Sequence, residues 1–273
     1  MNRFYPIKIY FNIVKMFLVR TFLRRGITNR DQPLVINDYR KSWGEGYRSV
    51  IWGRKLRVLR VNGRLTIGRA IDSRKFFIAH INKFIRSVGP KQVLELGSGI
   101  GINILALAVL NPNIKSFKGI ELTAEGVEQA RSALKDIPVK ELMYLTEEDE
   151  ATIRQRLANR DIEFIQGDIL HLPWHDKSFD FVFSCWVIEQ LPRQYREAFL
   201  EAKRVLKGHA LFIEEFKEAQ ENIFQLLHLN NVDYFHASFA EVGKLGFKIL
   251  GFEPMAMSKI KFTYGSLFCS ANL

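Results

Sequence analysis

One acidic residue and three alternate glycines form the stretch of this 273-residue chain whose residue types and spacing could do chemistry. Glu95 lies within the apolar run 93–96, and Gly97, Gly99 and Gly101 follow it directly. Glycines lack Cβ atoms, so the backbone of such a turn can pass close to a ligand, and the free amides at the start of the following helix can donate hydrogen bonds. This stretch is therefore the first place where we expect a bound ligand.

The elements around this turn alternate between short apolar runs and segments with helical spacing. Nearly continuous apolar strands that alternate with helices are typical of a parallel sheet covered on both faces. The predicted fold class is therefore α/β: a doubly wound, mostly parallel seven-stranded sheet with an N-terminal helical and hairpin extension. Strands are expected at residues 93–96, 117–122, 162–166, 179–185, 210–214, 247–252 and 262–270.

Polar residues stand at the carboxyl ends of several of these strands. Glu121 closes the second strand, Asp168 follows the third, and Ser184 lies near the end of the fourth. Ligands of doubly wound sheets bind outside the carboxyl ends of the strands, so these side chains should converge on one crevice with Glu95. A carboxylate after the second strand suits the two hydroxyls of a ribose, and Asp168 could accept a hydrogen bond from an exocyclic amine such as that of adenine.

These residues leave two nucleotide cofactors open. A dinucleotide fingerprint reads G-x-G-x-x-G, whereas the glycines here fall as G-x-G-x-G. Glu95 would face a pyrophosphate unfavourably, but it suits a cofactor that carries an ammonium group. Spacing and charge both disfavour NAD, and no Gly-Lys-Ser/Thr follows the loop, as a phosphate-binding P-loop would require.

With these motifs the chain resembles the class I S-adenosylmethionine-dependent methyltransferases, in the small-molecule group related to quinone and sterol methylases. The resemblance covers residues 76–216 and is most detailed at 167–184, 187–192 and 204–207. It implies S-adenosylmethionine as cofactor, with Glu95 and the Gly97 backbone holding the methionine part, Glu121 the ribose, and Asp168 with the Ile169 backbone the adenine. The cofactor-binding residues expected on this basis are Glu95, Gly97, Gly99, Gly101, Glu121, Asp168, Ile169 and Ser184.

The sequence departs from this family at two places. Gln190 stands where many relatives have His, so a base cannot be assumed there. After Lys207, Gly208-His209-Ala210 replaces the usual Pro-Gly-Gly and leaves one glycine for the expected turn into the fifth strand. Methyl transfer from a sulfonium is a direct displacement that positioning can accelerate, and a base is needed only if the acceptor must lose a proton. The candidates near the pocket mouth are Glu189, Gln190, Tyr39, His228 and His236, and each histidine has a structural role as its alternative.

Residues 1–75 precede the methyltransferase domain, which we place at 76–273. Segment 1–30 is a basic, aromatic-rich helix without acidic residues; it could lie on an anionic membrane surface, pack on its own domain or a second subunit, or be a processed targeting sequence. Segment 31–75 forms an accessory cap and a hairpin, with Asn62-Gly63 as the turn. The aromatic residues of 38–54 could cap an apolar ligand or form a satellite core cluster, and a helix capped by Asp72 or Ser73 follows the hairpin.

Composition limits the partners without choosing among them. The net charge of +11 and the isoelectric point near 9.6 favour an anionic partner such as nucleic acid, a phospholipid surface or a phosphorylated substrate. Cys185 and Cys269 lie far apart, which indicates neither a disulfide framework nor a thiolate metal site, so we expect no metal and a cytoplasmic protein, with membrane association open. No apolar run reaches the roughly 18 to 20 residues that cross a bilayer.

The leading prediction is a methyltransferase for a small-molecule acceptor, with a hydrophobic or lipid-like body suggested by Trp43, Tyr47 and Trp52. A nucleic-acid methyltransferase is less favoured, because Ser184-Cys185-Trp186 stands where amino-directed nucleic-acid enzymes carry Asn/Asp-Pro-Pro-aromatic and no RNA-binding module is appended. Two further functions stay open, a non-catalytic S-adenosylmethionine-binding protein and an NAD-dependent oxidoreductase. The oligomeric state and the methylated atom are not predicted.

Overall fold

The computed structural model describes residues 5–23, 30–43, 47–53 and 56–271. Residues 1–4 and 24–29 of the predicted segment 1–30, and Gly44 and Gly46 of 38–54, therefore lie outside the described residues. Within them no helix is both long enough and apolar enough to cross a membrane.

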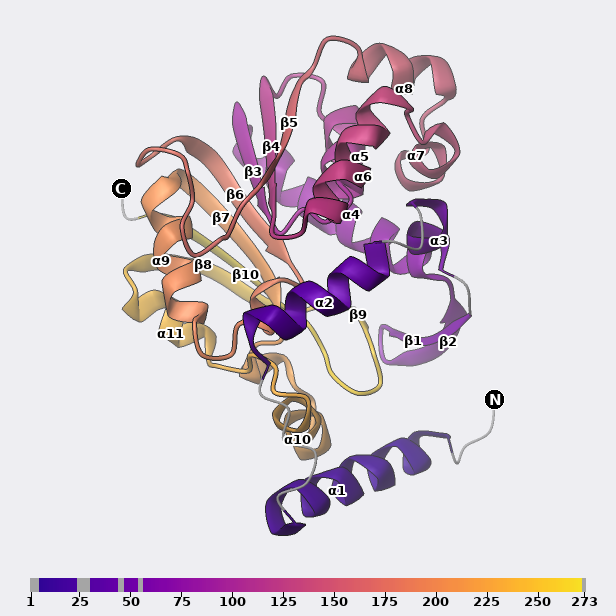
Figure 1. Cartoon of the computed structure of the whole chain (residues 1–273), viewed down its shortest axis with the longest axis vertical. Coiled ribbons are helices and arrows are strands. Elements are labelled where there is room, and N and C mark those ends of the chain that lie inside the picture. Colours follow the sequence, from indigo (N-terminus) through magenta and orange to yellow (C-terminus); the bar gives the residue numbers. More distant parts are fainter. Residues whose placement is uncertain (1–4, 24–29, 44–46, 54–55, 272–273) are drawn as a thin grey trace.

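A seven-stranded sheet forms the centre of the molecule and confirms the predicted fold class (Figure 1). The strand order is β5-β4-β3-β6-β7-β10-β8, with β3 to β7 parallel and β10 antiparallel to both of its neighbours. The carboxyl ends of the parallel strands therefore meet at one edge. The strands are β3 (Gln92–Leu96), β4 (Ser116–Glu121), β5 (Asp161–Gln166), β6 (Phe179–Cys185), β7 (Leu206–Glu214), β8 (Phe247–Pro254) and β10 (Gly265–Ala271).

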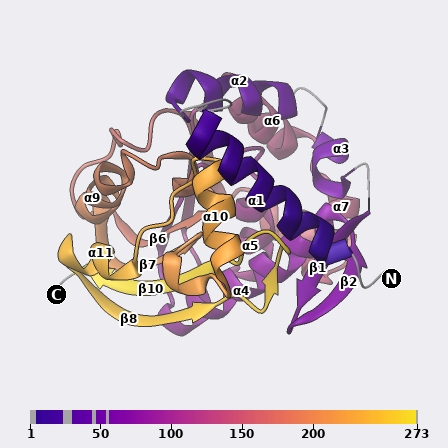
Figure 2. The same cartoon turned by 90° about the horizontal axis from the view of Figure 1, so that it is seen from below.

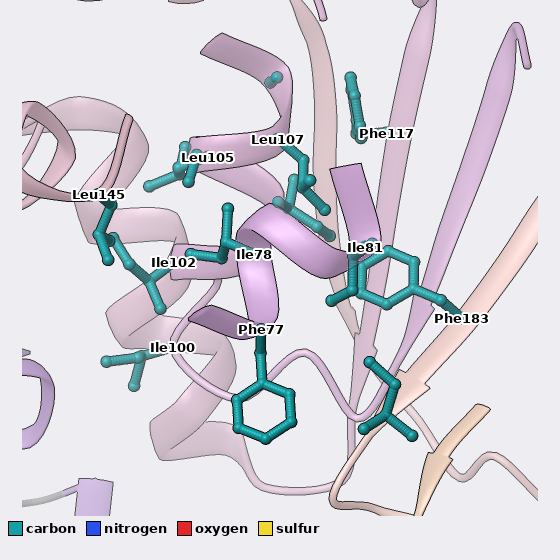
Figure 3. Packing of buried hydrophobic residues seen from close by; sticks show 14 of the residues in the cluster. Phe77, Ile78, Ile81, Ile100, Ile102, Leu105, Leu107, Phe117, Leu145 and Phe183 are labelled. Atoms are coloured by element: carbon teal, nitrogen blue, oxygen red, sulfur yellow. The ribbon is translucent and has the colours of Figure 1, made fainter. Parts of the chain in front are cut away.

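Helices cover both faces of the sheet (Figure 1), and each face has its own apolar core. One core packs α4 and α5 against β3, β4 and β6, as Figure 3 shows for Phe77, Ile81 and Phe183. The other packs α9 and α11 against the opposite face. The helices are α4 (Ala70–Val88), α5 (Ile102–Leu110), α6 (Ala124–Lys135), α7 (Val139–Thr146), α8 (Glu150–Leu157), α9 (Tyr195–Val205), α10 (Ile223–Asn231) and α11 (Phe239–Lys244).

The N-terminal extension contacts segments near the C-terminus that are far from it in sequence. Helix α1 (Tyr5–Leu23) lies on α10 (Figure 2). The rings of Tyr10 and Phe224 stack there, with their centres 4.9 Å apart. The predicted hairpin is confirmed as β1 (Arg57–Val61) and β2 (Arg64–Gly68), and β9 (Met257–Ser258) adds a third strand to it. Asn62 and Gly63 both have positive φ, 49° and 76°, as the favoured two-residue hairpin turn requires. Helices α2 (Gln32–Trp43) and α3 (Tyr47–Trp52) complete the extension.

Several local predictions were wrong for identifiable reasons. No turn separates α9 from β7: the strand begins at Leu206, directly after the helix, and Gly208 lies within it. A Cβ at Gly208 would lie 2.3 Å from the carbonyl oxygen of Asp180, so glycine is needed for the close approach of β6 and β7 at a register shift. Helix α4 begins at Ala70 rather than after Asp72 or Ser73, because the Asp72 carboxylate reaches back to the amide of Arg69.

Candidate active site

The glycines of the turn between β3 and α5 adopt left-handed backbone conformations in a crowded environment. Gly97, Gly99 and Gly101 have φ values of +64°, +52° and +78°. A Cβ at Gly97 would lie 2.5 Å from a methyl group of Val187, and one at Gly101 would lie 2.5 Å from the Phe164 ring. Backbone strain and lack of space thus both demand glycine at these two positions.

Glu95 is a buried carboxyl with one unsatisfied oxygen. Its side chain is 1% exposed, and Oε1 accepts a hydrogen bond of 2.6 Å from Asn103 Nδ2. Asn103 Oδ1 in turn accepts from Arg74 Nη1 at 3.0 Å. Oε2 of Glu95 has no hydrogen-bond partner among the described residues. Burial raises the pKa of Glu95 to about 8, against the opposing effect of the Asn103 hydrogen bond. A cationic ligand group would satisfy this site.

Glu121, the last residue of β4, is hydrogen-bonded to the glycine turn. Its Oε2 accepts a hydrogen bond of 3.1 Å from the Gly99 amide. Its Oε1 accepts from both the amide and the hydroxyl of Thr123, at 3.0 and 2.6 Å. The Glu121 side chain is therefore held beside the glycine turn, and it is only 7% exposed.

Asp168 follows β5, the strand next to β4. Its Oδ1 accepts from the Leu170 amide at 2.9 Å, and its Oδ2 accepts from Gln32 Nε2 at 2.6 Å. The adjacent Ile169 is buried in the apolar core on one face of the sheet. The Gln32 contact joins residues 136 positions apart.

Helix α2 covers this edge of the sheet. It begins at Gln32, on Asp168, and ends at Trp43, whose ring would lie 3.1 Å from a Cβ at either Gly99 or Gly126. An ion pair of 2.8 Å between Arg40 and Glu125 holds α2 on α6. Trp43 therefore lies on the glycine turn, whereas Trp52 points elsewhere and donates a hydrogen bond to Glu141 of α7. Both rings pack against the apolar core, Trp43 over the glycine turn and Trp52 beside α7.

A second group of polar residues lies at the ends of β6 and β7. The Ser184 hydroxyl donates a 2.6 Å hydrogen bond to Glu214, which also accepts from the amides of Val187 and Glu189. Burial raises the pKa of Glu214 to about 8. The contact found for Ser184 is thus structural, within the sheet.

The structure brings Tyr39, Glu189 and Gln190 together beside this group. Gln190 Nε2 donates to Glu189 at 2.6 Å, and Gln190 Oε1 accepts from the Arg30 guanidinium. The pKa of Tyr39 is raised well above its usual value by burial and then by the charge of Glu189. The Arg30 guanidinium also lies over the Tyr234 ring, 4.9 Å from its centre.

The two candidate histidines occupy different surroundings. His228 is buried and stacks on Phe262, and burial lowers its pKa to about 4, so it is neutral at physiological pH. His236 contacts the Tyr234 carbonyl through Nδ1 and lines a separate surface pocket with Tyr195 and Lys217. The backbone beside His236 does touch the group around Glu189, since the Phe235 amide donates a 3.0 Å hydrogen bond to the Glu189 carbonyl, but the His236 side chain lines the other pocket.

Sequence reasoning missed several residues of this region. Glu214 and Glu215 end an apolar run in the same way as the acids that were selected, so strand-end position alone could have found them. No sequence signal links Gln32 to Asp168 or Lys259 to the ends of β6 and β7. No group of three potential metal ligands occurs in the described ranges.

The doubly wound sheet, its tight glycine turn and the carboxylates at its strand ends define a nucleotide-cofactor enzyme of the Rossmann-like class. Residues 94–213 match the family model described as a methyltransferase domain. This part of the chain is therefore a class I S-adenosylmethionine-dependent methyltransferase domain, with S-adenosylmethionine as its cofactor. This confirms the family, the enzyme class and the cofactor expected from the sequence, and it removes the NAD-dependent oxidoreductase from consideration.

Solved structures agree at the level of the fold. The magnesium protoporphyrin IX methyltransferase of Synechocystis PCC 6803 with bound S-adenosylhomocysteine is 13% identical, covers 89% of this chain and all of its own, and gives a TM-score of 0.57. The [4+2]-cyclase SpnF is 16% identical over 88% and 93% of the chains, with a TM-score of 0.57. A methyltransferase from Methanosarcina mazei is 18% identical over 70% and 97%, with a TM-score of 0.53. No curated protein matches the sequence.

Proposed function

We propose that this chain transfers the methyl group of S-adenosylmethionine to a small acceptor that binds beside Glu189. The observation that carries the proposal is the buried, half-satisfied Glu95 carboxyl next to a glycine turn that tolerates no side chain at Gly97 or Gly101. Glu95 and the Gly97 backbone would hold the cofactor's amino acid end. The unpartnered hydroxyl of Ser98, 7% exposed, adds a second free polar group at the same turn. These groups fit a ligand with a charged amino acid part.

The other cofactor contacts follow from the strand ends. Glu121 would accept from the ribose hydroxyls, and Asp168 with the Ile169 backbone would contact the adenine. Both acids already accept hydrogen bonds, from Thr123 and Gly99 in one case and from Gln32 and Leu170 in the other. Gln32 must therefore share Asp168 with the cofactor or move with α2. S-adenosylmethionine supplies an electrophilic methyl group, and the chain would supply position and exclude water.

We expect Asp168→Ala and Glu121→Ala each to weaken binding of S-adenosylhomocysteine at least tenfold. A tenfold loss corresponds to about 1.4 kcal/mol, the scale of one hydrogen bond to a charged group. Isothermal titration calorimetry measures the affinity of each variant for S-adenosylhomocysteine. Glu163→Ala is the matched control, because that carboxylate is exposed on β5 and paired with Lys118. Unchanged affinity in both site variants would contradict the assignment.

The outer face of α1 supports a second part of the proposal, contact with an anionic membrane surface. Ile7, Phe11 and Leu18 are 60%, 69% and 47% exposed and fall on one side of the helix, with Lys8 and Lys15 beside them. The opposite side, including Ile13, packs on α10. Rings and aliphatic side chains next to cations, with no acid in the helix, suit a bilayer surface that carries negative lipids.

This contact predicts that the protein cosediments with vesicles containing phosphatidylserine and binds at least tenfold more weakly to pure phosphatidylcholine. Phe11→Ser combined with Leu18→Ser should remove most of the binding, because two apolar side chains leave the interface. Leu200→Ser is the control, since Leu200 is equally exposed, at 48%, but lies on α9. If the α1 variant binds vesicles like the wild type, or if the same substitutions instead dissociate a dimer in solution, α1 is not the membrane contact.

A further inference from the structure

A buried cluster of carboxyls, aromatic rings and one ammonium group lies at the ends of β6 and β7. Its acids are Glu189, 7% exposed, and Glu215, fully buried. Neither oxygen of Glu215 nor Oε2 of Glu189 accepts a hydrogen bond from an N–H or hydroxyl donor in the described part of the chain. Burial, and then the charge of Glu189, raises the pKa of Glu215 well above its usual range. Burying an ionised carboxyl without hydrogen-bond donors lowers the folding stability, unless a nearby cation compensates its charge.

Aromatic rings form the other side of the cluster, and a lysine of the chain lies over them. Lys259 Nζ is 4.7 Å from the ring centre of Phe262, 5.6 Å from that of Tyr264 and 5.7 Å from that of Trp186. Trp186 and Tyr264 stack at 5.2 Å, and the buried Tyr264 hydroxyl has no hydrogen-bond partner among the described residues. Rings at these distances attract a cation, so the cluster holds an alkylammonium group.

The position of the cluster ties it to the cofactor edge. Trp186 and Glu189 belong to the segment that follows β6, and Val187 between them fills the space next to Gly97. Glu215 follows β7, the neighbouring strand. The rings and carboxyls thus border the glycine turn on the side opposite β4 and β5, where the nucleotide would lie.

We infer that the acceptor of this enzyme is an amine, whose nitrogen is recognised by Glu189, Glu215 and the rings of Trp186 and Tyr264. This rests on the proposed function of the neighbouring cofactor site. Lys259 is the chain's own substitute for that amine: it has the same charge and an apolar stem, and it lies on the loop after the two-residue strand β9, which pairs with β1 alone. The amine can come from a soluble molecule or from an aminophospholipid headgroup on the surface contacted by α1.

The reaction balances with the groups present. An acceptor ammonium gives one proton to the Glu189–Glu215 pair, and the freed nitrogen lone pair forms the new bond to the methyl carbon. The bond from that carbon to sulfur breaks with its electron pair on sulfur, which leaves a neutral thioether and a methylated ammonium. The proton then passes from the carboxyl pair to solvent. The chain's contribution is to hold and deprotonate the nitrogen while the rings stabilise the cationic product.

Measurements of amine binding test this inference without requiring methyl transfer. We expect octylamine to bind the protein saturated with S-adenosylhomocysteine at least tenfold more tightly than 1-octanol, by calorimetry. Glu189→Gln and Glu215→Gln should each reduce amine affinity at least tenfold while S-adenosylhomocysteine affinity stays within twofold. Lys259→Met should raise amine affinity, because the internal cation no longer competes. Glu163→Gln is the matched control, and thermal melting verifies that each variant folds.

Transfer from labelled cofactor then identifies the source of the amine. Labelling of soluble octylamine, or of phosphatidylethanolamine in vesicles with phosphatidylcholine, supports the inference and distinguishes the two sources. Equal binding of octanol and octylamine, no effect of either glutamine variant, or transfer to oxygen or carbon but not to nitrogen would overturn it. Failure of the wild type to bind S-adenosylhomocysteine would instead overturn the proposed function.

Discussion

Gly97→Ala should cost about 3 kcal/mol of folding stability. A left-handed φ of +64° costs a residue with a Cβ roughly 1–2 kcal/mol, and forcing a methyl group into packed space adds 1–3 kcal/mol. The added Cβ would lie 2.5 and 2.6 Å from the two Val187 methyl groups and 3.2 Å from Val187 Cβ, so rotation of the Val187 side chain relieves only part of the crowding. The turn must open, and cofactor affinity should fall more than tenfold with it. Urea unfolding and calorimetry measure the two effects.

Gly89→Ala is the matched control for this prediction. Gly89 has the same φ of +64°, at the end of α4, but a Cβ there would meet nothing within 4 Å. Gly89→Ala should therefore lower the folding stability only by the backbone strain, about 1–2 kcal/mol, and should leave cofactor affinity unchanged. The double variant Gly97→Ala/Val187→Ala should recover the part of the loss that comes from crowding. Equal destabilisation by Gly97→Ala and Gly89→Ala would show that crowding at the turn contributes nothing.

The sequence predicted the sheet well because its strands are nearly continuous apolar runs. The strand at Phe179–Cys185 has the predicted bounds, and the strands ending at Glu121 and Gln166 begin one residue earlier than predicted. The glycine turn was equally readable, since close approach and positive φ leave no other residue type. Gly208 was misread because a glycine within a strand and one in a turn carry the same sequence signal. Only the 2.3 Å approach to Asp180 distinguishes them.

The site was less predictable where it depends on contacts between distant segments. Strand-end position identified Glu95, Glu121 and Asp168, because the carboxyl ends of parallel strands share one edge. Gln32 reaches Asp168 only because α2 lies across α6, and no local pattern encodes that packing. Lys259 reads as a surface cation in sequence, but it lies over buried rings because the loop after β9 folds back on β6.

The affinity of the protein for S-adenosylhomocysteine should rise at least tenfold between pH 6 and pH 8. Without ligand, Glu95 keeps its proton up to a pKa of about 8. A ligand ammonium favours the ionised carboxylate, so binding below pH 8 releases a proton and strengthens as pH rises. The neighbouring Arg74 charge assists ionisation and the Glu121 charge opposes it.

The same proton gives this prediction a second observable. In the unfolded chain Glu95 titrates near 4.5, so the ligand-free protein should lose stability as pH rises from about 5 to 8, where only the folded state holds the proton. Glu95→Gln should flatten both pH profiles, because an amide neither ionises nor binds the proton. Calorimetry at pH 7 in two buffers of different ionisation enthalpy counts the proton directly, and close to one proton should be released by the wild type and none by Glu95→Gln. If both proteins release the same number, Glu95 does not hold the ammonium group, and the cofactor's amino acid end must bind elsewhere.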